Sequence, residues 1–312
     1  MVDMNTLLSL QITIFLLVLA GYIMTKMSIL PPSVRGPLSD LVIDFILPCN
    51  IIVSFLLEFN KEILQACLTI LAVSICIQIF TIVAGDKFYS KKNPGEHTVL
   101  KYATIVSNAG FLGNPIAQGL YGETGLLYAS VYLIPVRIFM WSAGIACFTG
   151  TKGKGVMKKV LTHPCIVAVI IGMVLMILQI PLPAGLEKTL RTAGNCNTAL
   201  CMIVIGNILA EIRIRDVFSK KTFWYSAVRL LIIPTIVFAG CRAAKLDAVV
   251  TGVSTVLAGM PAPASGVILA AKYHGEEHFA VKIVFLSTVL SLITVPLLCV
   301  MMTAFQGNMT VG

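Results

Sequence analysis

The residues best suited to chemistry in this 312-residue sequence are asparagines, glycines and prolines that interrupt an apolar run. They lie in SNAGFLGNPIAQG, residues 107–119. We predict that one helix stops near Gly110 and that the next begins with Asn114 as N-cap and Pro115 at the first helical position. Such a restart exposes free N–H groups and the positive end of a helix dipole, which together favour an anion.

A second interruption, AGMPAPASG, covers residues 258–266. Here a helix is predicted to stop at Gly259 and to restart at Pro261 or Pro263, with Ser265 in the new first turn. Backbone groups freed inside lipid have no water to bond, so such breaks are tolerated where they line a cavity. Paired breaks in the two halves of a chain indicate a transport site at the membrane midplane, whereas the alternative is a pair of plain proline kinks.

Arg137 is the most informative charge, because it lies in the middle of the apolar stretch VYLIPVRIFMWSAG. An arginine at that depth is costly and must face a cavity or a carboxylate. Arg137 therefore binds a substrate carboxylate, pairs with Asp44, or extends its stem toward one membrane face. Asp44 is in turn either a protonation or cation site or the partner that neutralises an internal arginine.

Enzyme chemistry finds little support in the sequence. HGEEH, residues 274–278, fits an inverted zinc-protease pattern, but it lies in a connector with no third ligand evident, and we interpret it as a turn. No serine–histidine set, paired intramembrane aspartates or Walker loop is evident. We therefore expect no catalytic residues, no metal site and no cofactor, and transport driven by gradients.

Composition indicates an integral membrane protein. The chain is 57% hydrophobic and 12% charged, with a mean hydropathy of +0.93, whereas soluble domains carry about 25% charged residues. The net charge of +9 does not indicate nucleic acid binding, because the basic residues lie in short connectors. Most of the nine cysteines lie in apolar runs and are predicted to be buried small hydrophobic residues.

The pattern of apolar runs predicts ten membrane-spanning helices. The expected spans are residues 5–26, 34–57, 62–85, 98–121, 124–149, 164–181, 187–210, 222–241, 247–273 and 277–304. Odd-numbered connectors carry 16 of the 23 Lys and Arg residues and the other side carries 5, which places the odd connectors in the cytoplasm. Both termini are then extracytoplasmic, in a multi-pass protein of the cell (inner) membrane.

The two breaks fall in spans 4 and 9, which are equivalent places if the chain consists of two five-span repeats. Because five is odd, the second repeat must be inverted. Short echoes agree with this: Tyr121-Gly122-Glu123 follows the first break and Tyr273-His274-Gly275-Glu276 follows the second. The predicted fold is therefore an all-α polytopic membrane protein with ten transmembrane helices in two inverted five-helix repeats, in which helices 4 and 9 are broken and cross.

Several segments resemble the auxin efflux carrier family, the relatives of the plant PIN-type carriers. GYIMTKMSILPPSVRGPLSDLVIDFILPCNII resembles its first two helices, NAGFLGNPIAQGLYG its Asn-x-Gly-x-x-Gly-x-Pro crossover, and MPAPASGVILAAKY its ninth helix. The crossover residues are Asn108, Gly110, Gly113 and Pro115, with Pro261 in the second break. The short loop between spans 5 and 6 is typical of prokaryotic members, whereas Ala199 replaces a proline that many relatives have.

The resemblance implies a division into scaffold and transport domains. Residues 1–58 and 151–211 would form the scaffold, and residues 59–150 and 212–312 the transport domain. The partners it implies are a small organic anion and the lipid bilayer, with no nucleic acid, and the scaffold helices are a candidate homodimer surface. The expected binding residues are Asn108, Gly113, Asn114, Pro115, Arg137, Pro261, Pro263, Ser265 and Ser54. Of these, Ser54 would contribute a hydroxyl from the scaffold side of the site.

A secondary carrier for a carboxylate is the function these observations favour, working by alternating access. A bile-acid-type sodium/organic-anion symporter, which has a similar architecture of crossing helices, is the alternative. That alternative predicts clustered Glu, Gln and Asn ligands for sodium at the crossing. Span 4 offers Asn108 and Asn114, whereas span 9 offers small residues after its break.

Overall fold

The described part of the chain consists of helices joined by turns and short unwound segments, without a β-strand. The computed structural model describes residues 4–56, 60–89, 93–140, 144, 147–148, 161–210, 217–263, 265–273 and 275–307. Within these residues four helical segments are long and apolar enough to cross a membrane: Gly36–Ser54, Lys61–Lys87, Lys220–Ala243 and Glu277–Met302. Shorter apolar helices add to them, so the fold is that of a polytopic membrane protein.

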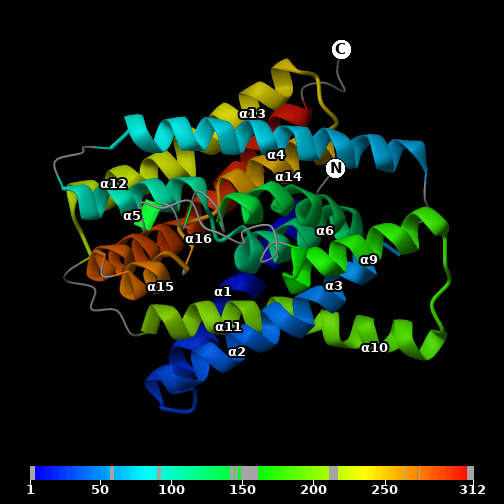
Figure 1. The fold of residues 1–312 in the computed structure, drawn as a ribbon, viewed down its shortest axis with the longest axis horizontal. Helices are drawn as coiled ribbons and strands as arrows, with labels where there is room; N and C mark the ends of the chain where they lie inside the picture. The colour runs from blue at the N-terminus through cyan, green and yellow to red at the C-terminus, as the bar shows by residue number, and fades with distance from the viewer. Residues whose placement is uncertain are drawn as a thin grey trace.

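Helices occupy parts of each range predicted as a span (Figure 1). In chain order they are α1 (Met4–Lys26), α2 (Arg35–Leu41), α3 (Leu47–Ser54), α4 (Lys61–Lys87), α5 (Pro94–Ile105), α6 (Asn114–Phe139), α9 (Pro164–Leu178), α10 (Ala184–Asn195), α11 (Asn197–Ala210), α12 (Lys220–Ala227), α13 (Ile233–Ala243), α14 (Ala248–Ala258), α15 (Ser265–Lys272) and α16 (Glu277–Gly307). A short 3₁₀ turn, η1 (Pro32–Val34), precedes α2. The number of membrane crossings stays a prediction.

Three widened π-helical turns punctuate these helices: η2 (Val42–Ile46), η3 (Ala109–Gly113) and η6 (Val228–Ile232). Each is followed, two residues after its end, by a proline, which is Pro48, Pro115 or Pro234 in turn. A proline lacks an N–H and its ring clashes with the carbonyl four residues earlier, and a wider turn relieves that clash. The local sequence therefore explains where the helices widen.

Two predicted spans are divided more sharply. Gly122 has φ 63° and ψ −150° inside α6, a backbone conformation that needs glycine, so the helix kinks where the sequence predicts a turn between spans 4 and 5. The range 187–210, predicted as one helix, is divided at Cys196 into α10 and α11. Its neighbours Gly194, Asn195 and Asn197 are weak helix formers, which is consistent with a break at that place.

The helices pack in two groups. In one group, α1 packs on α11, and α3 packs on α9 and α10. In the other, α4, α5, α6 and α12–α16 pack on one another. Figure 1 shows α10, α11 and α2 along one edge of the molecule and α4 and α13 along the opposite edge. The groups meet mainly where α3 contacts α6 and where α1 contacts α16.

Candidate functional site

The two predicted interruptions meet in space. The backbone N–H of Asn108, in the first break, donates a 2.9 Å hydrogen bond to the carbonyl of Pro261 in the second. One residue further on, the Ala262 N–H donates to Ser287 Oγ on α16 at 3.1 Å. Backbone groups freed by the breaks thus bond to each other and to a neighbouring helix, which removes the cost of leaving them unpaired.

The first break lies earlier than predicted. Helix α5 ends at Ile105, the chain is unwound at residues 106–108, and η3 then leads directly into α6. Gly110 therefore lies inside the π-turn and not after a helix end. Asn114 has helical dihedral angles and makes no cap hydrogen bond, because its position already continues a helical turn. The N-cap prediction for Asn114 was wrong, whereas Pro115 does lie in the first turn of α6.

The second break agrees more closely with its prediction. Helix α14 ends at Ala258 with Gly259 as its C-cap, and α15 begins at Ser265. The Ser265 hydroxyl is 2.8 Å from the Tyr102 hydroxyl on α5, so the helix before one break is tied to the helix after the other. Residues 260–263 are buried, as expected for unwound backbone inside a membrane.

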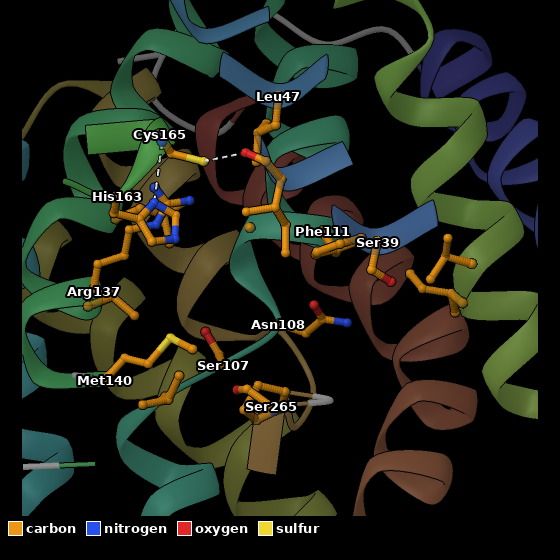
Figure 2. A pocket seen from close by; sticks show the side chains of 18 residues that line it. Ser39, Leu47, Ser107, Asn108, Phe111, Arg137, Met140, His163, Cys165 and Ser265 are labelled. Carbon is orange, nitrogen blue, oxygen red and sulfur yellow. Dashed lines mark hydrogen bonds between the residues drawn. The ribbon is translucent and has the colours of Figure 1, made fainter. Parts of the chain in front are cut away.

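A cavity of about 210 Å³ lies beside this crossing and between the two helix groups. One wall comes from the crossing and α6, and the other from α2, η2, α3, the start of α9, and α11 (Figure 2). Its lining residues are Ser39, Ile43, Leu47, Val106, Ser107, Asn108, Gly110, Phe111, Leu133, Val136, Arg137, Met140, His163, Cys165, Val204, Ile205, Pro263 and Ser265. The cavity is thus mostly apolar, with a few convergent polar groups, as is typical of a small-molecule site.

Arg137 supplies the positive charge of the cavity. Its side chain is 9% exposed, and its Nη2 would lie 3.7 Å from a methyl group placed on Gly110. The guanidinium therefore approaches the π-turn η3 closely enough that a methyl group at Gly110 would be in ordinary van der Waals contact with it. Figure 2 shows Arg137 extending toward the His163 imidazole.

His163 adds a directed donor next to Arg137. Its Nδ1 accepts a hydrogen bond from the Cys165 amide at 3.3 Å, which caps helix α9. Burial, and then the neighbouring Arg137 charge, lower the pKa of His163 to about 4, so the ring is neutral at pH 7. With Nδ1 used as an acceptor, the proton is on Nε2, which is a donor. The pair Arg137 and His163 therefore offers N–H groups, which suit an anion.

The structure brings four of the predicted binding residues to the cavity wall: Asn108, Arg137, Pro263 and Ser265. The other five do not line it: Gly113, Asn114, Pro115, Pro261 and Ser54. The Ser54 hydroxyl donates to its own helix, to Ile51 O at 2.7 Å, and Ser54 is not among the residues that line this cavity. Gly113 instead allows close packing, because a methyl group there would lie 3.2 Å from Met260 Cγ.

Asn114 has a different environment. Its side chain is fully buried, and neither amide atom has a hydrogen-bond partner among the residues that the structure describes. A buried amide without partners costs about 1–3 kcal/mol. No contact among the described residues therefore explains why a polar side chain lies at the start of α6.

Asp44 does not pair with Arg137. Its side chain is exposed on η2, and no ion pair joins these two described residues. The carboxylate lies one residue from Ile43, whose side chain lines the cavity and whose carbonyl accepts from Cys165 Sγ at 3.6 Å. Of the readings left open for Arg137, pairing with Asp44 therefore has no support in the geometry.

Sequence reasoning did not single out His163, Ser39, Ser107 and Cys165. A histidine directly before Pro164, at the start of a predicted span, is a sequence signal that could have indicated an N-cap at the membrane boundary. Ser107 begins the first interruption but was not predicted to bind substrate, and Ser39 and Cys165 carry no such signal, because small polar residues are common in membrane helices. Their place in the cavity follows from helix packing.

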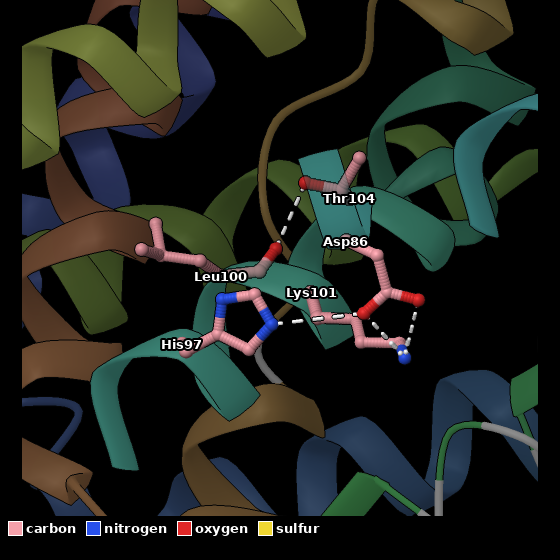
Figure 3. Close-up of polar contacts among 5 residues, drawn as sticks. All are labelled: Asp86, His97, Leu100, Lys101 and Thr104. Carbon is pink, nitrogen blue, oxygen red and sulfur yellow. Dashed lines mark hydrogen bonds and ion pairs between the residues drawn. The ribbon is translucent and has the colours of Figure 1, made fainter. Parts of the chain in front are cut away.

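A separate charged cluster lies outside the cavity, where α4 ends and α5 begins (Figure 3). Lys101 Nζ donates to both carboxylate oxygens of Asp86, at 2.8 and 3.0 Å, and His97 Nε2 is 3.7 Å from the same carboxylate. Lys221 on α12 also donates to Glu96. These pairs connect α4, α5 and α12 at one end of their helix group.

Comparisons with known proteins agree with this architecture. A family model described as "Membrane transport protein" matches residues 7–158 and 151–299. A protein of Methanothermobacter thermautotrophicus named "Uncharacterized transporter" is 25% identical over 293 residues, covering 92% of this chain and 95% of that protein. A Rhizobium meliloti protein named "Putative malonate transporter" is 19% identical over 310 residues, covering 94% of each chain.

The family match covers most of the chain and confirms the resemblance on which the sequence analysis depended. The transporter relatives align over nearly their full lengths, so the likeness is not confined to one segment. The chain therefore belongs to the membrane transport protein family that includes the auxin efflux carriers, and it is a multi-pass membrane transport protein and not an enzyme.

Proposed function

We propose that this protein is a secondary transporter that moves a small organic carboxylate across the membrane by alternating access. The observation that carries the proposal is the meeting of two broken helices, through the Asn108–Pro261 hydrogen bond, beside a cavity that contains Arg137. Broken helices at the midplane are the usual sites of substrate in such carriers. Arg137 and the neutral His163 supply donors for a carboxylate.

The packing of the helices in two groups supports a mechanism in which one group moves and the other stays fixed. The cavity is lined by both groups, so a shift of one against the other would change its access. In this proposal residues 1–58 and 151–211 form the scaffold, and residues 59–150 and 212–312 form the transport domain. The scaffold helices are then also the candidate homodimer surface.

Carboxylate binding is tested by thermal-shift screening of the purified protein. The panel contains mono- and dicarboxylates, malonate among them, with neutral amides and amines of similar size as controls. A ligand at 100 times its dissociation constant stabilises the folded protein by about 2.7 kcal/mol, which a melting curve detects readily. Preferential stabilisation by the neutral or cationic compounds would overturn the proposal.

The same screen, repeated with sodium and with potassium, separates the proposal from a sodium symporter. The unpartnered amide of Asn114 is the observation that favours sodium, because its oxygen is a hard donor without a partner. Flux in proteoliposomes completes the test. Uptake that requires sodium at constant membrane potential would assign the protein to the symporter class.

Membrane orientation follows from the proposed ten helices in two inverted repeats. With 16 basic residues in the odd connectors and 5 in the others, both termini are expected outside the cytoplasm of the cell that carries the protein. A reporter fused after residue 312 should be active when it is a periplasmic reporter and inactive when it is a cytoplasmic one. The reverse pattern would exclude the proposed orientation, with both termini outside the cytoplasm.

A further inference from the structure

Arg229 is a second buried arginine, and it lies away from the cavity. It belongs to the π-turn η6, and its side chain is 3% exposed. An arginine buried within a membrane protein is costly unless its donors are bonded, so its partners indicate its role. None of the ion pairs found among the described residues involves Arg229.

Its partners are the carbonyl ends of both broken helices. Arg229 Nε donates to Met260 O at 2.9 Å, and Arg229 Nη1 donates to Thr104 O at 3.0 Å. Thr104 is in the last turn of α5, and Met260 is two residues beyond the end of α14. Carbonyls at helix C-termini lack partners within their helix and carry partial negative charge, about half an elementary charge for each helix end. One guanidinium therefore offsets the partial negative charge of two helix ends.

The geometry of the guanidinium gives this contact a positional consequence. Its donors form a planar, rigid fork, so two carbonyls bonded to it are held at a set separation. Other bonds hold Thr104 itself in place: its hydroxyl donates to Leu100 O at 2.8 Å, as Figure 3 shows, and lies 2.8 Å from the Tyr89 hydroxyl. Arg229 then fixes Met260 relative to this anchored end.

The cavity wall begins a few residues beyond the two carbonyls. Asn108 follows Thr104 by four residues, and its amide bonds to Pro261, the residue after Met260. Pro263 and Ser265, on the same side of the second break, line the cavity with Asn108. A displacement of either helix end at Arg229 would therefore alter the spacing of groups on the cavity wall.

We propose that Arg229 is a positioning residue for substrate binding. It joins the C-terminal ends of α5 and α14, so that the two breaks move as one unit. The groups on the cavity wall that come from the two breaks then keep a constant spacing. The effect on substrate rests on the proposed function. The effect on the crossing does not, because it concerns the protein without ligand.

Hydrogen exchange of the purified, ligand-free protein tests the proposal in Arg229→Gln and Arg229→Lys. Both variants lose the two-pronged donor, so amides in residues 105–113 and 259–266, including that of Asn108, should exchange at least about 10-fold faster. Peptides from α1 and α11 should keep their wild-type rates. Tyr225→Phe is the matched control, because Tyr225 also bonds the end of α5, through Ala103 O at 2.8 Å, but does not reach the second break. It should leave residues 259–266 unchanged.

Three outcomes would overturn the proposal: unchanged exchange in both segments, faster exchange spread evenly over the chain, or wild-type exchange in Arg229→Lys, which would mean that charge alone suffices. If Arg229→Gln cannot be purified, Arg229→Lys decides, because it keeps the charge and loses the fork. The affinity for whichever compound stabilises the wild type should fall in Arg229→Lys and stay within about twofold in Tyr225→Phe. A failure of carboxylate binding in the wild type would reject the proposed function and leave the exchange result valid.

Discussion

Replacing Arg137 with Gln is expected to weaken carboxylate binding by about 10- to 150-fold. The guanidinium is the charged donor of the cavity, and a hydrogen bond to a charged group contributes about 1.5–3 kcal/mol, where 1.4 kcal/mol is a factor of ten. The measurement is the dissociation constant of the best carboxylate from the thermal-shift panel. Affinity for neutral analogues should change little, because they do not engage the charge.

The melting temperature of the same variant distinguishes the two roles considered for this arginine. Since Asp44 is exposed and forms no ion pair with Arg137, the substitution should not lower the melting temperature. Lys188→Gln is the charge-matched control, because it removes an exposed cation on α10 that does not line the cavity. Retained affinity with a lowered melting temperature would show that Arg137 is structural and does not bind substrate.

Replacing Gly206 with Ala is expected to destabilise the protein by about 1–3 kcal/mol or more. A methyl group at Gly206 on α11 would overlap the carbonyl oxygen of Val18 on α1, and a methyl group at Gly21 on α1 would likewise overlap the carbonyl oxygen of Ile203 on α11. These neighbours are backbone atoms, which cannot move aside as a flexible side chain does. The helices would have to separate, and close packing through small residues is a main source of helix association in membranes.

The melting temperature in detergent measures this effect, with Gly240→Ala on α13 as the control. No atom of the described residues lies within 4 Å of a methyl group at Gly240, and alanine favours a helix over glycine by about 0.5–1 kcal/mol. The control should therefore melt at the wild-type temperature or slightly above it. A wild-type melting temperature for Gly206→Ala would mean that α1 and α11 are farther apart than the structure has them.

Much of the architecture is readable from local sequence. The low fraction of charged residues requires a membrane, because no soluble core of this length could bury so many apolar residues. The three X-Pro steps at Pro48, Pro115 and Pro234 account for the widened turns, since the proline ring acts on a carbonyl only four residues away. Gly122 likewise accounts for the kink in α6, because it adopts a backbone conformation that needs glycine.

The candidate site was predictable in part. Asn108, Arg137, Pro263 and Ser265 were identified because a broken helix and an intramembrane arginine are unusual whatever surrounds them. His163 was missed because its role depends on α9 starting beside α6, a contact between segments far apart in the chain. The numbers of spans and repeats, the domain division and the orientation stay predictions.

By itself, then, the sequence determined the membrane class, the existence of two breaks and the chemistry available at them. Tertiary structure decided where the first break lies. The hydrogen bond from the Asn108 N–H to the Pro261 carbonyl stabilises an unwound backbone at residues 106–108. Local preference instead favours a break at residues 110–114. Tertiary structure also decided that Arg137 faces a cavity, that Asp44 is exposed and forms no ion pair with Arg137, and that Arg229 binds both helix ends. The physical reason is that cap and turn preferences act over four or five residues, whereas these bonds join residues that are 31 or more positions apart in the chain, whose pairing no local preference encodes.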